Sequence, residues 1–136
     1  MPVAFAMPGQ QASNGQSHRI DVWIFDLDCC GSQLRSLTKL LSPVEQLRCS
    51  RLKQSVLAAR LTVAHARVRQ ILGSYLGTAL YQDEFVLNAY GKPRVRPAPL
   101  AQPLNFNLAH SGRVCGVAVC LTGEIGLDIE TIDTPP

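Results

Sequence analysis

Two patterns of apolar positions follow one another along the chain. Residues 20–27 are rich in β-branched and aromatic side chains, which favours a strand. Between residues 43 and 72, apolar side chains recur at helical spacing and predict one or two helices. These positions are Leu47, Leu52, Val56, Leu57, Leu61, Ala64, Val68, Ile71 and Leu72. The pattern therefore indicates a chain that combines strands with helices.

The helical stretch has recognisable boundaries. Ser42 suits the N-cap, Pro43 suits the first helical position, and Glu45 is placed to close a capping box. Gly73 is the predicted end, because glycine often follows the last helical residue. The sequence thus predicts that helical structure begins at residue 43 and ends near residue 72.

The second half of the chain predicts short strands separated by turns. Residues 85–87 and 104–108 favour extended structure, residues 91–93 a turn, and residues 94–103 a proline-rich connection. Residues 113–121 form a continuous apolar run typical of a buried strand. A turn at residues 122–124 then predicts a hairpin between residues 114–121 and 125–130. Residues 1–18 are rich in Gly, Ser, Gln, Asn and Pro, so we expect a flexible tail there and a folded region over residues 19–132.

Composition narrows the class of protein. The chain has 136 residues, of which 46 % are hydrophobic and 17 % charged, as in one globular domain and unlike a disordered chain. No apolar run reaches the roughly 18 residues of a membrane helix, and the N-terminus does not resemble a signal peptide. The five cysteines are odd in number and lack metal-site spacing, which argues against a disulfide framework. These features predict a cytoplasmic protein without a membrane partner.

Charge is distributed unevenly. Residues 31–76 contain eight Lys or Arg and one acid, whereas residues 123–136 contain four acids and no base. One interpretation is an anionic partner held by the basic stretch and a cation held by the acidic one. The alternative is two differently solvated faces. No aromatic residues interleave with the bases, which weakens a nucleic-acid interpretation.

Two carboxylates near the C-terminus are a candidate metal site. Asp128 and Glu130 are two residues apart, so on an extended segment their side chains share one side, at roughly 7 Å spacing along the backbone. Such a pair suits Mg²⁺, which commonly takes one or two carboxylates and completes its shell with water and phosphate. Gly126 leaves space beside them. The alternative is an exposed acidic edge.

Two further segments offer groups for an anion. His110 lies in a polar cluster at residues 105–112 and can donate a hydrogen bond to a phosphate. Lys92 lies between a glycine and a proline, on a loop of defined shape, and lysine binds phosphate as a point charge. An ordinary turn with a satisfied histidine and an ordinary surface loop are the respective alternatives.

The order of these segments is more specific than any one of them. A Leu-Ser-Pro start at residues 41–43 is followed by an arginine-led helical segment at residues 60–77 and Gly-Lys-Pro at residues 91–93. Phe-Asn-Leu-Ala-His-Ser then occupies residues 106–111, and Gly-Leu-Asp-Ile-Glu residues 126–130. Over residues 20–131, this order resembles the N-terminal half of the Sfp-type 4'-phosphopantetheinyl transferases that activate non-ribosomal peptide and polyketide synthases.

The resemblance implies a fold and an activity. The fold is α/β (α+β), one half of a pseudo-twofold architecture, with a small, mostly antiparallel sheet packed by one or two helices. The activity is Mg²⁺-dependent transfer of 4'-phosphopantetheine from coenzyme A to a serine of an apo acyl or peptidyl carrier protein. Matched by motif, Asp128 and Glu130 correspond to metal ligands. The positions matched to coenzyme A binding are Arg48, Arg60, Lys92, Asn107 and His110.

The sequence also departs from the family pattern. Ala109 stands where the family commonly has Ser or Thr, and the C-terminal half, with its third acid and a lysine, is absent from the 136 residues. We therefore assign no catalytic residue and expect weak or no activity from this chain alone, with a homodimer left open as a way to rebuild the cleft. The alternative is a non-catalytic module that binds coenzyme A or a carrier protein. A nucleic-acid-binding domain is the least favoured hypothesis.

Overall fold

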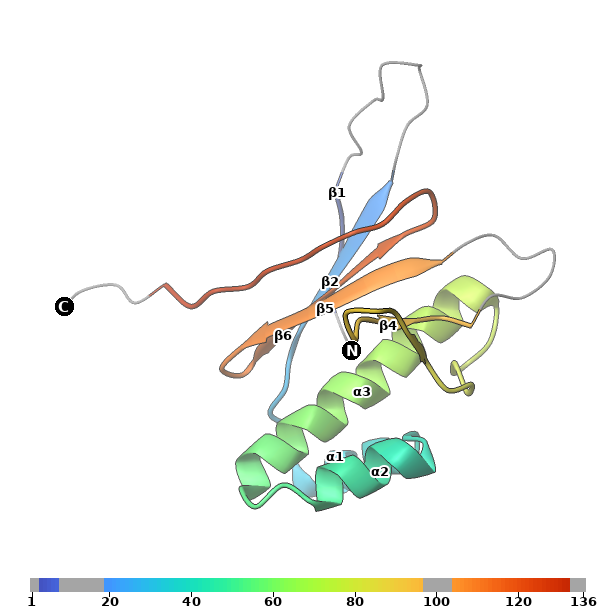
Figure 1. Ribbon diagram of the computed structural model, residues 1–136. Helices are drawn as coiled ribbons and strands as arrows, with labels where there is room; N and C mark the ends of the chain where they lie inside the picture. The colour runs from blue at the N-terminus through green and yellow to red at the C-terminus, as the bar shows by residue number, and fades with distance from the viewer. Residues whose placement is uncertain (1–2, 8–18, 97–103, 133–136) are drawn as a thin grey trace, which may run out of the picture. The chain divides into compact units, whose positions relative to one another are not determined.

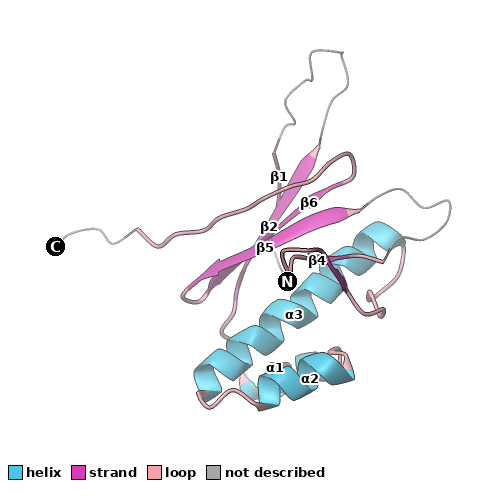
Figure 2. Cartoon of the chain, viewed as in Figure 1, coloured by secondary structure: helices cyan, strands magenta, loops and turns pink. Residues whose placement is uncertain are grey.

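The structure is a computed structural model that describes residues 3–7, 19–96 and 104–132. It contains helices and a small antiparallel sheet, which confirms the α+β class (Figure 2). The chain divides into two compact units, one made of Met1–Phe25 with Asp83–Pro136 and the other of Asp26–Gln82. We call them the sheet unit and the helical unit. Among the described residues, no helix combines the length and apolar character needed to cross a lipid bilayer.

The sheet unit is built on four strands in the order β1-β2-β6-β5 (Figure 1). Their bounds are β1 Val3–Met7, β2 Ile20–Asp26, β5 Asn105–Ser111 and β6 Val114–Cys120. The pairs β1–β2 and β5–β6 are antiparallel. Strand β6 is the apolar centre of the sheet, with Cys115, Val117 and Val119 almost completely buried. Burial of this strand explains its continuous apolar sequence.

The N-terminal segment differs from the expected flexible tail. Residues 3–7 form β1, which pairs along its full length with residues 20–24 of β2. Composition favoured a tail because Gly, Ser, Gln and Asn dominate residues 9–17. The short apolar run before them can form a strand when a partner strand is available. The rest of the predicted tail lies outside the described residues.

A second, two-stranded sheet lies in the same unit. Strands β3 (Val86–Leu87) and β4 (Pro93–Arg94) pair antiparallel around the predicted turn, where Gly91 has a φ of 81°. The ring of Phe85 lies 5.5 Å from the ring of Phe106 on β5, centroid to centroid. This contact links the small sheet to the large one. Most of the proline-rich connection predicted at residues 94–103 lies outside the described residues.

The predicted hairpin partner of β6 is not a strand. Residues 124–132 are extended but carry no strand pairing. The expected alternation is nevertheless present, since Ile125, Leu127 and Ile129 are half-buried while the residues between them are exposed. The hairpin prediction was wrong: this segment forms no ladder with β6, and side chains bind two of its backbone groups, the carbonyl oxygen of Ile125 and the N–H of Leu127.

The helical unit consists of α1 (Gly31–Thr38), α2 (Pro43–Ser50) and α3 (Ser55–Leu76). Helices α1 and α2 both contact α3 (Figure 1). The predicted helical stretch is thus two helices, and the Ser42–Glu45 capping box is formed as expected, with Glu45 N–H donating to Ser42 Oγ at 3.2 Å. Helix α1 was not predicted, because its sequence offers few apolar residues and no capping side chain.

The end of α3 also differs from the prediction. The helix continues through Gly73 to Leu76, and Gly77 ends it in a left-handed conformation with φ of 73°. Gly73 is needed for another reason: a Cβ there would lie 2.8 Å from the backbone nitrogen of Leu80. The chain folds back against the helix at this glycine, and Thr78 N–H donates to its carbonyl oxygen at 2.9 Å.

A buried ionic cluster joins α2 to α3. Glu45 accepts hydrogen bonds from Arg69 Nε at 2.6 Å and from His65 Nδ1, and Arg69 also donates to the carbonyl oxygen of Tyr81 at 2.8 Å. Burial by itself would raise the pKa of Glu45. The bonds from His65, from the backbone of Ser42 and from Arg69, with the charge of Arg69, outweigh burial and lower that pKa to about 2. The carboxylate therefore stays ionised inside the helical unit.

Candidate functional site

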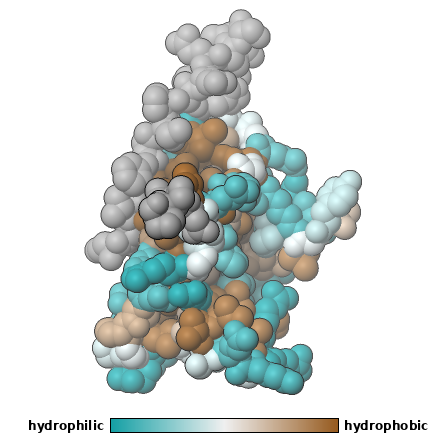
Figure 3. All heavy atoms as spheres, turned by 90° about the vertical axis from the view of Figure 1, so that its left-hand side faces the viewer, coloured by the Kyte–Doolittle hydropathy of each residue, from teal (hydrophilic) through white to brown (hydrophobic). Residues whose placement is uncertain are grey.

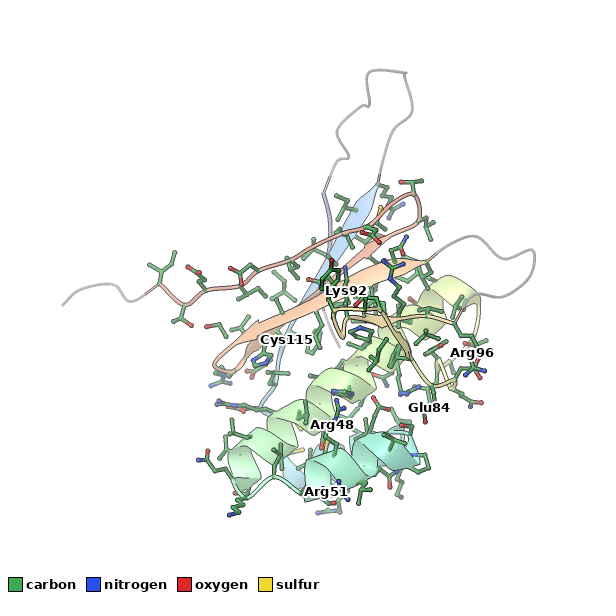
Figure 4. The ribbon with its side chains drawn as sticks, in the orientation of Figure 1. Arg48, Arg51, Glu84, Lys92, Arg96 and Cys115 are labelled. Atoms are coloured by element: carbon green, nitrogen blue, oxygen red, sulfur yellow. The ribbon has the colours of Figure 1, made fainter. Side chains whose placement is uncertain are left out.

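The predicted metal ligands lie on residues 125–131 of the sheet unit, which we call the acidic segment. Lys92, labelled in Figure 4, donates from Nζ to the carbonyl oxygen of Ile125 at 2.6 Å. The N–H of Leu127 donates to Asn107 Oδ1 at 2.8 Å. At the far end, the hydroxyls of Ser111 and Thr131 are 2.6 Å apart. Three side chains from outside the segment thus hold it at three points.

The acidic segment also rests on the sheet through apolar contacts. A Cβ at Gly116 of β6 would lie 2.5 Å from Ile129 Cδ1 and 3.0 Å from Leu127 Cδ2. The missing side chain at Gly116 therefore leaves the space that Leu127 and Ile129 fill. Because alternate side chains of an extended segment point to opposite sides, Asp128 and Glu130 are turned toward solvent.

The acidic segment fits a hard divalent cation. Two carboxylates on one exposed side are the protein ligands that Mg²⁺ commonly uses when substrate phosphate and water supply the rest. Within residues 3–7, 19–96 and 104–132, no group of three or more His, Cys, Asp or Glu side chains is placed to hold a metal on its own. Asp128 and Glu130 could hold a cation only with further oxygen ligands, such as water or a substrate phosphate.

Two predicted anion-binding residues belong to the same unit. Lys92 is half-buried next to β4, and its ammonium has three donors, of which one binds the acidic segment. His110 is exposed near the end of β5. In the same unit, Arg94 forms an ion pair with Glu124, the residue that precedes the acidic segment. The structure thus brings Lys92, Asn107 and the carboxylates into one unit of the fold.

The other two predicted residues lie in the helical unit. Arg48 is exposed on α2 (Figure 4). Arg60 is half-buried on α3 and donates from Nε to Asp28 Oδ1 at 2.8 Å and from Nη2 to Asp28 Oδ2 at 3.2 Å. This two-point pairing fixes the plane of the guanidinium group. Arg48 and Arg60 therefore share a unit with each other but not with the acidic segment.

The surface of the helical unit carries one sign of charge over residues 31–57. The only acid within residues 31–57 is Glu45, which is 7 % exposed and bound to Arg69 and His65, so it adds little negative charge to the surface. The exposed charged side chains there are Arg35, Lys39, Arg48, Arg51 and Lys53. Figure 3 shows apolar side chains of this unit surrounded by hydrophilic ones. A basic surface of this kind attracts anions.

Sequence reasoning missed two residues that hold candidate groups in place, one in each unit. Asp28 pairs with Arg60 across 32 positions of sequence, and no local signal marks it. Gly116 did carry a signal, because a glycine inside an apolar strand often marks a close approach of another segment.

A comparison with known proteins identifies the family. The chain is 35 % identical over 114 residues, 84 % of its length, to the 4'-phosphopantetheinyl transferase HetI of Nostoc sp. (strain PCC 7120 / SAG 25.82 / UTEX 2576). The chain belongs to the 4'-phosphopantetheinyl transferase superfamily. The matched region is 48 % of HetI, so the chain spans about half the length of this relative. No family model matches the chain. The resemblance drawn from the motifs is confirmed at the level of the superfamily.

Proposed function

We propose that the chain binds coenzyme A, with a Mg²⁺ ion held by Asp128 and Glu130. We further propose that it acts in moving 4'-phosphopantetheine onto a serine of an apo acyl or peptidyl carrier protein. The observation that carries the proposal is the acidic segment: two exposed carboxylates on a segment fixed at three points, in a member of the 4'-phosphopantetheinyl transferase superfamily.

The basic residues have a matching role in this proposal. Coenzyme A carries a pyrophosphate and a further phosphate, so it needs several cationic contacts. Lys92 retains donors beyond its bond to Ile125. His110 is exposed on the same unit, and the resemblance matches Arg48 and Arg60 to further contacts with coenzyme A. Arginine suits such contacts because its planar group binds phosphate through two donors at once.

The proposed reaction is a phosphoryl transfer. The serine oxygen of the carrier protein forms a bond to the phosphorus that bears pantetheine, and the bond from that phosphorus to the bridging pyrophosphate oxygen breaks. The serine proton passes to solvent, and 3',5'-ADP leaves. A bound Mg²⁺ supplies charge stabilisation at the phosphates. Asp128 and Glu130 hold the cation, while Lys92 and His110 hold the anionic leaving group.

We expect weak or no transfer by these 136 residues alone. The resemblance assigns a third acid and a lysine near the reacting phosphate to a region that the 136 residues do not include. A second copy of the chain, as a homodimer, is one arrangement that would supply further groups. Binding of coenzyme A and transfer are therefore separate expectations.

One assay separates the two. The chain is incubated with an apo carrier protein, coenzyme A and Mg²⁺; the carrier is weighed by mass spectrometry, and coenzyme A retained by the chain is measured by equilibrium dialysis. Retained coenzyme A with little or no gain in carrier mass is the expected result. A full gain would show that the chain is a complete catalyst. No retention and no gain would refute the proposal.

A further inference from the structure

Asn107 has a partner that its sequence position does not reveal. Matched by motif, it was expected to contact coenzyme A, yet its Oδ1 accepts the N–H of Leu127 at 2.8 Å. Leu127 directly precedes Asp128 in the chain. The half-buried side chain of Asn107 therefore binds the backbone one residue before the first carboxylate.

This bond helps to fix the register of the acidic segment on the sheet, which strand pairing would otherwise fix. Residues 124–132 lack strand pairing, so no backbone ladder sets their register on the sheet. A slip of one residue along an extended segment would exchange its two sides and turn Asp128 and Glu130 toward the sheet. The bond to Leu127 and the space above Gly116 are both specific to the observed register.

We propose that Asn107 is a positioning residue: it fixes the register of the acidic segment so that Asp128 and Glu130 point together to the solvent side, where a cation can bind. Only the part of the inference that concerns cation binding rests on the proposed function. The hydrogen bond to Leu127 stands independently of it. Asn107 acts through the backbone of the acidic segment and not by touching the ligand.

Asn105 provides a matched control. It is the same residue type on the same face of β5, two positions away, and it is also half-buried. Among the described residues, Asn105 makes no side-chain hydrogen bond to the acidic segment. Asn107→Leu removes the acceptor, Asn107→Asp keeps an acceptor oxygen in place, and Asn105→Leu tests the change of side chain alone.

The first measurement is amide hydrogen exchange of Leu127 by NMR in the full chain without metal. We expect exchange about tenfold faster in Asn107→Leu, and near the parent rate in Asn107→Asp and Asn105→Leu. If Asn107→Leu does not fold, Asn107→Ser, whose side chain is too short to reach Leu127, carries the same expectation. Equal Leu127 exchange in the parent and in the Leu or Ser variant would overturn the proposal.

The second measurement is Mn²⁺ binding, followed by the EPR signal of the free ion. We expect the dissociation constant to rise about tenfold in Asn107→Leu and to change little in Asn105→Leu. Unchanged Mn²⁺ affinity in Asn107→Leu, beside faster Leu127 exchange, would overturn the link to the cation. Absence of Mn²⁺ binding by the parent would refute the metal site of the proposed function, while Leu127 exchange would still decide the role of Asn107.

Discussion

The end of the Ile129 side chain occupies the space that a side chain at Gly116 would need. A Cβ there would lie 2.5 Å from Ile129 Cδ1, closer than carbon atoms approach without displacement. Because the atom it meets is the flexible end of a side chain, Gly116→Ala should fold but shift the acidic segment, at a cost of about 1 kcal/mol in the free energy of unfolding. Urea denaturation measures this cost.

Gly123→Ala is the control for this prediction. A Cβ at Gly123 meets no atom within 4 Å, so we expect a stability within about 0.5 kcal/mol of the parent. Equal destabilisation by the two substitutions would show that the packing of Ile129 over Gly116 is not what the glycine provides.

The buried carboxylate of Glu45 predicts a dependence of stability on pH. Its pKa in the folded chain is lowered to about 2, so its contribution is present above the unfolded pKa of roughly 4.3 and is lost as the pH falls toward 2. The shift corresponds to about 3 kcal/mol. Chemical denaturation between pH 7 and pH 2.5 should show this loss in the parent, with a much flatter profile in Glu45→Gln. Parallel profiles would contradict it.

At Gly73, we predict that a substitution favoured by helix propensity lowers stability. Alanine is the better helix former, yet Gly73→Ala should destabilise the chain by about 1–3 kcal/mol, because the new methyl group meets the backbone of residues 78–80. Ser74→Ala, one residue further along α3 and exposed, should leave stability near that of the parent. Thermal unfolding monitored by circular dichroism compares the two. A Gly73→Ala variant as stable as the parent would show that the chain does not fold back closely there.

The cysteines should differ in their reaction with iodoacetamide. Hydrogen bonds from the Ser32 side chain and from the backbone N–H of Gln33 lower the pKa of the exposed Cys30 thiol, whereas burial raises the pKa of Cys115 to about 12. We expect Cys30 to be alkylated first at pH 7 and Cys115 only after unfolding. Peptide mapping over time gives the order. Ser32→Ala should slow the reaction of Cys30, and an unchanged rate would exclude the hydroxyl as its cause.

Local signals predicted much of the fold. The capping box at Ser42 and Glu45, the buried strand β6 and the alternation around Asp128 depend on residues close together in the sequence, and all three are present. Helix α1 and strand β1 were missed. Each depends on contacts with distant parts of the chain, α1 with α3 and β1 with β2, rather than on its own composition.

For the candidate site too, local spacing predicted some features, while contacts between distant residues were missed. Spacing alone placed Asp128 and Glu130 on one exposed side. Their attachment through Asn107, Lys92 and Gly116 joins residues between 11 and 33 positions away, and such contacts leave no periodic pattern in a single sequence. The ion pair of Arg60 with Asp28 is missed for the same reason.

The most direct test is calorimetric titration of coenzyme A into the full chain, with and without Mg²⁺. The comparison uses the parent, Asp128→Asn and the control Glu124→Gln, which removes an equal charge at an acid paired with Arg94. We predict Mg²⁺-dependent binding by the parent and by Glu124→Gln, and an affinity about tenfold or more weaker in Asp128→Asn. Equal affinities in the parent and Asp128→Asn, with or without Mg²⁺, would contradict a cation site on the acidic segment.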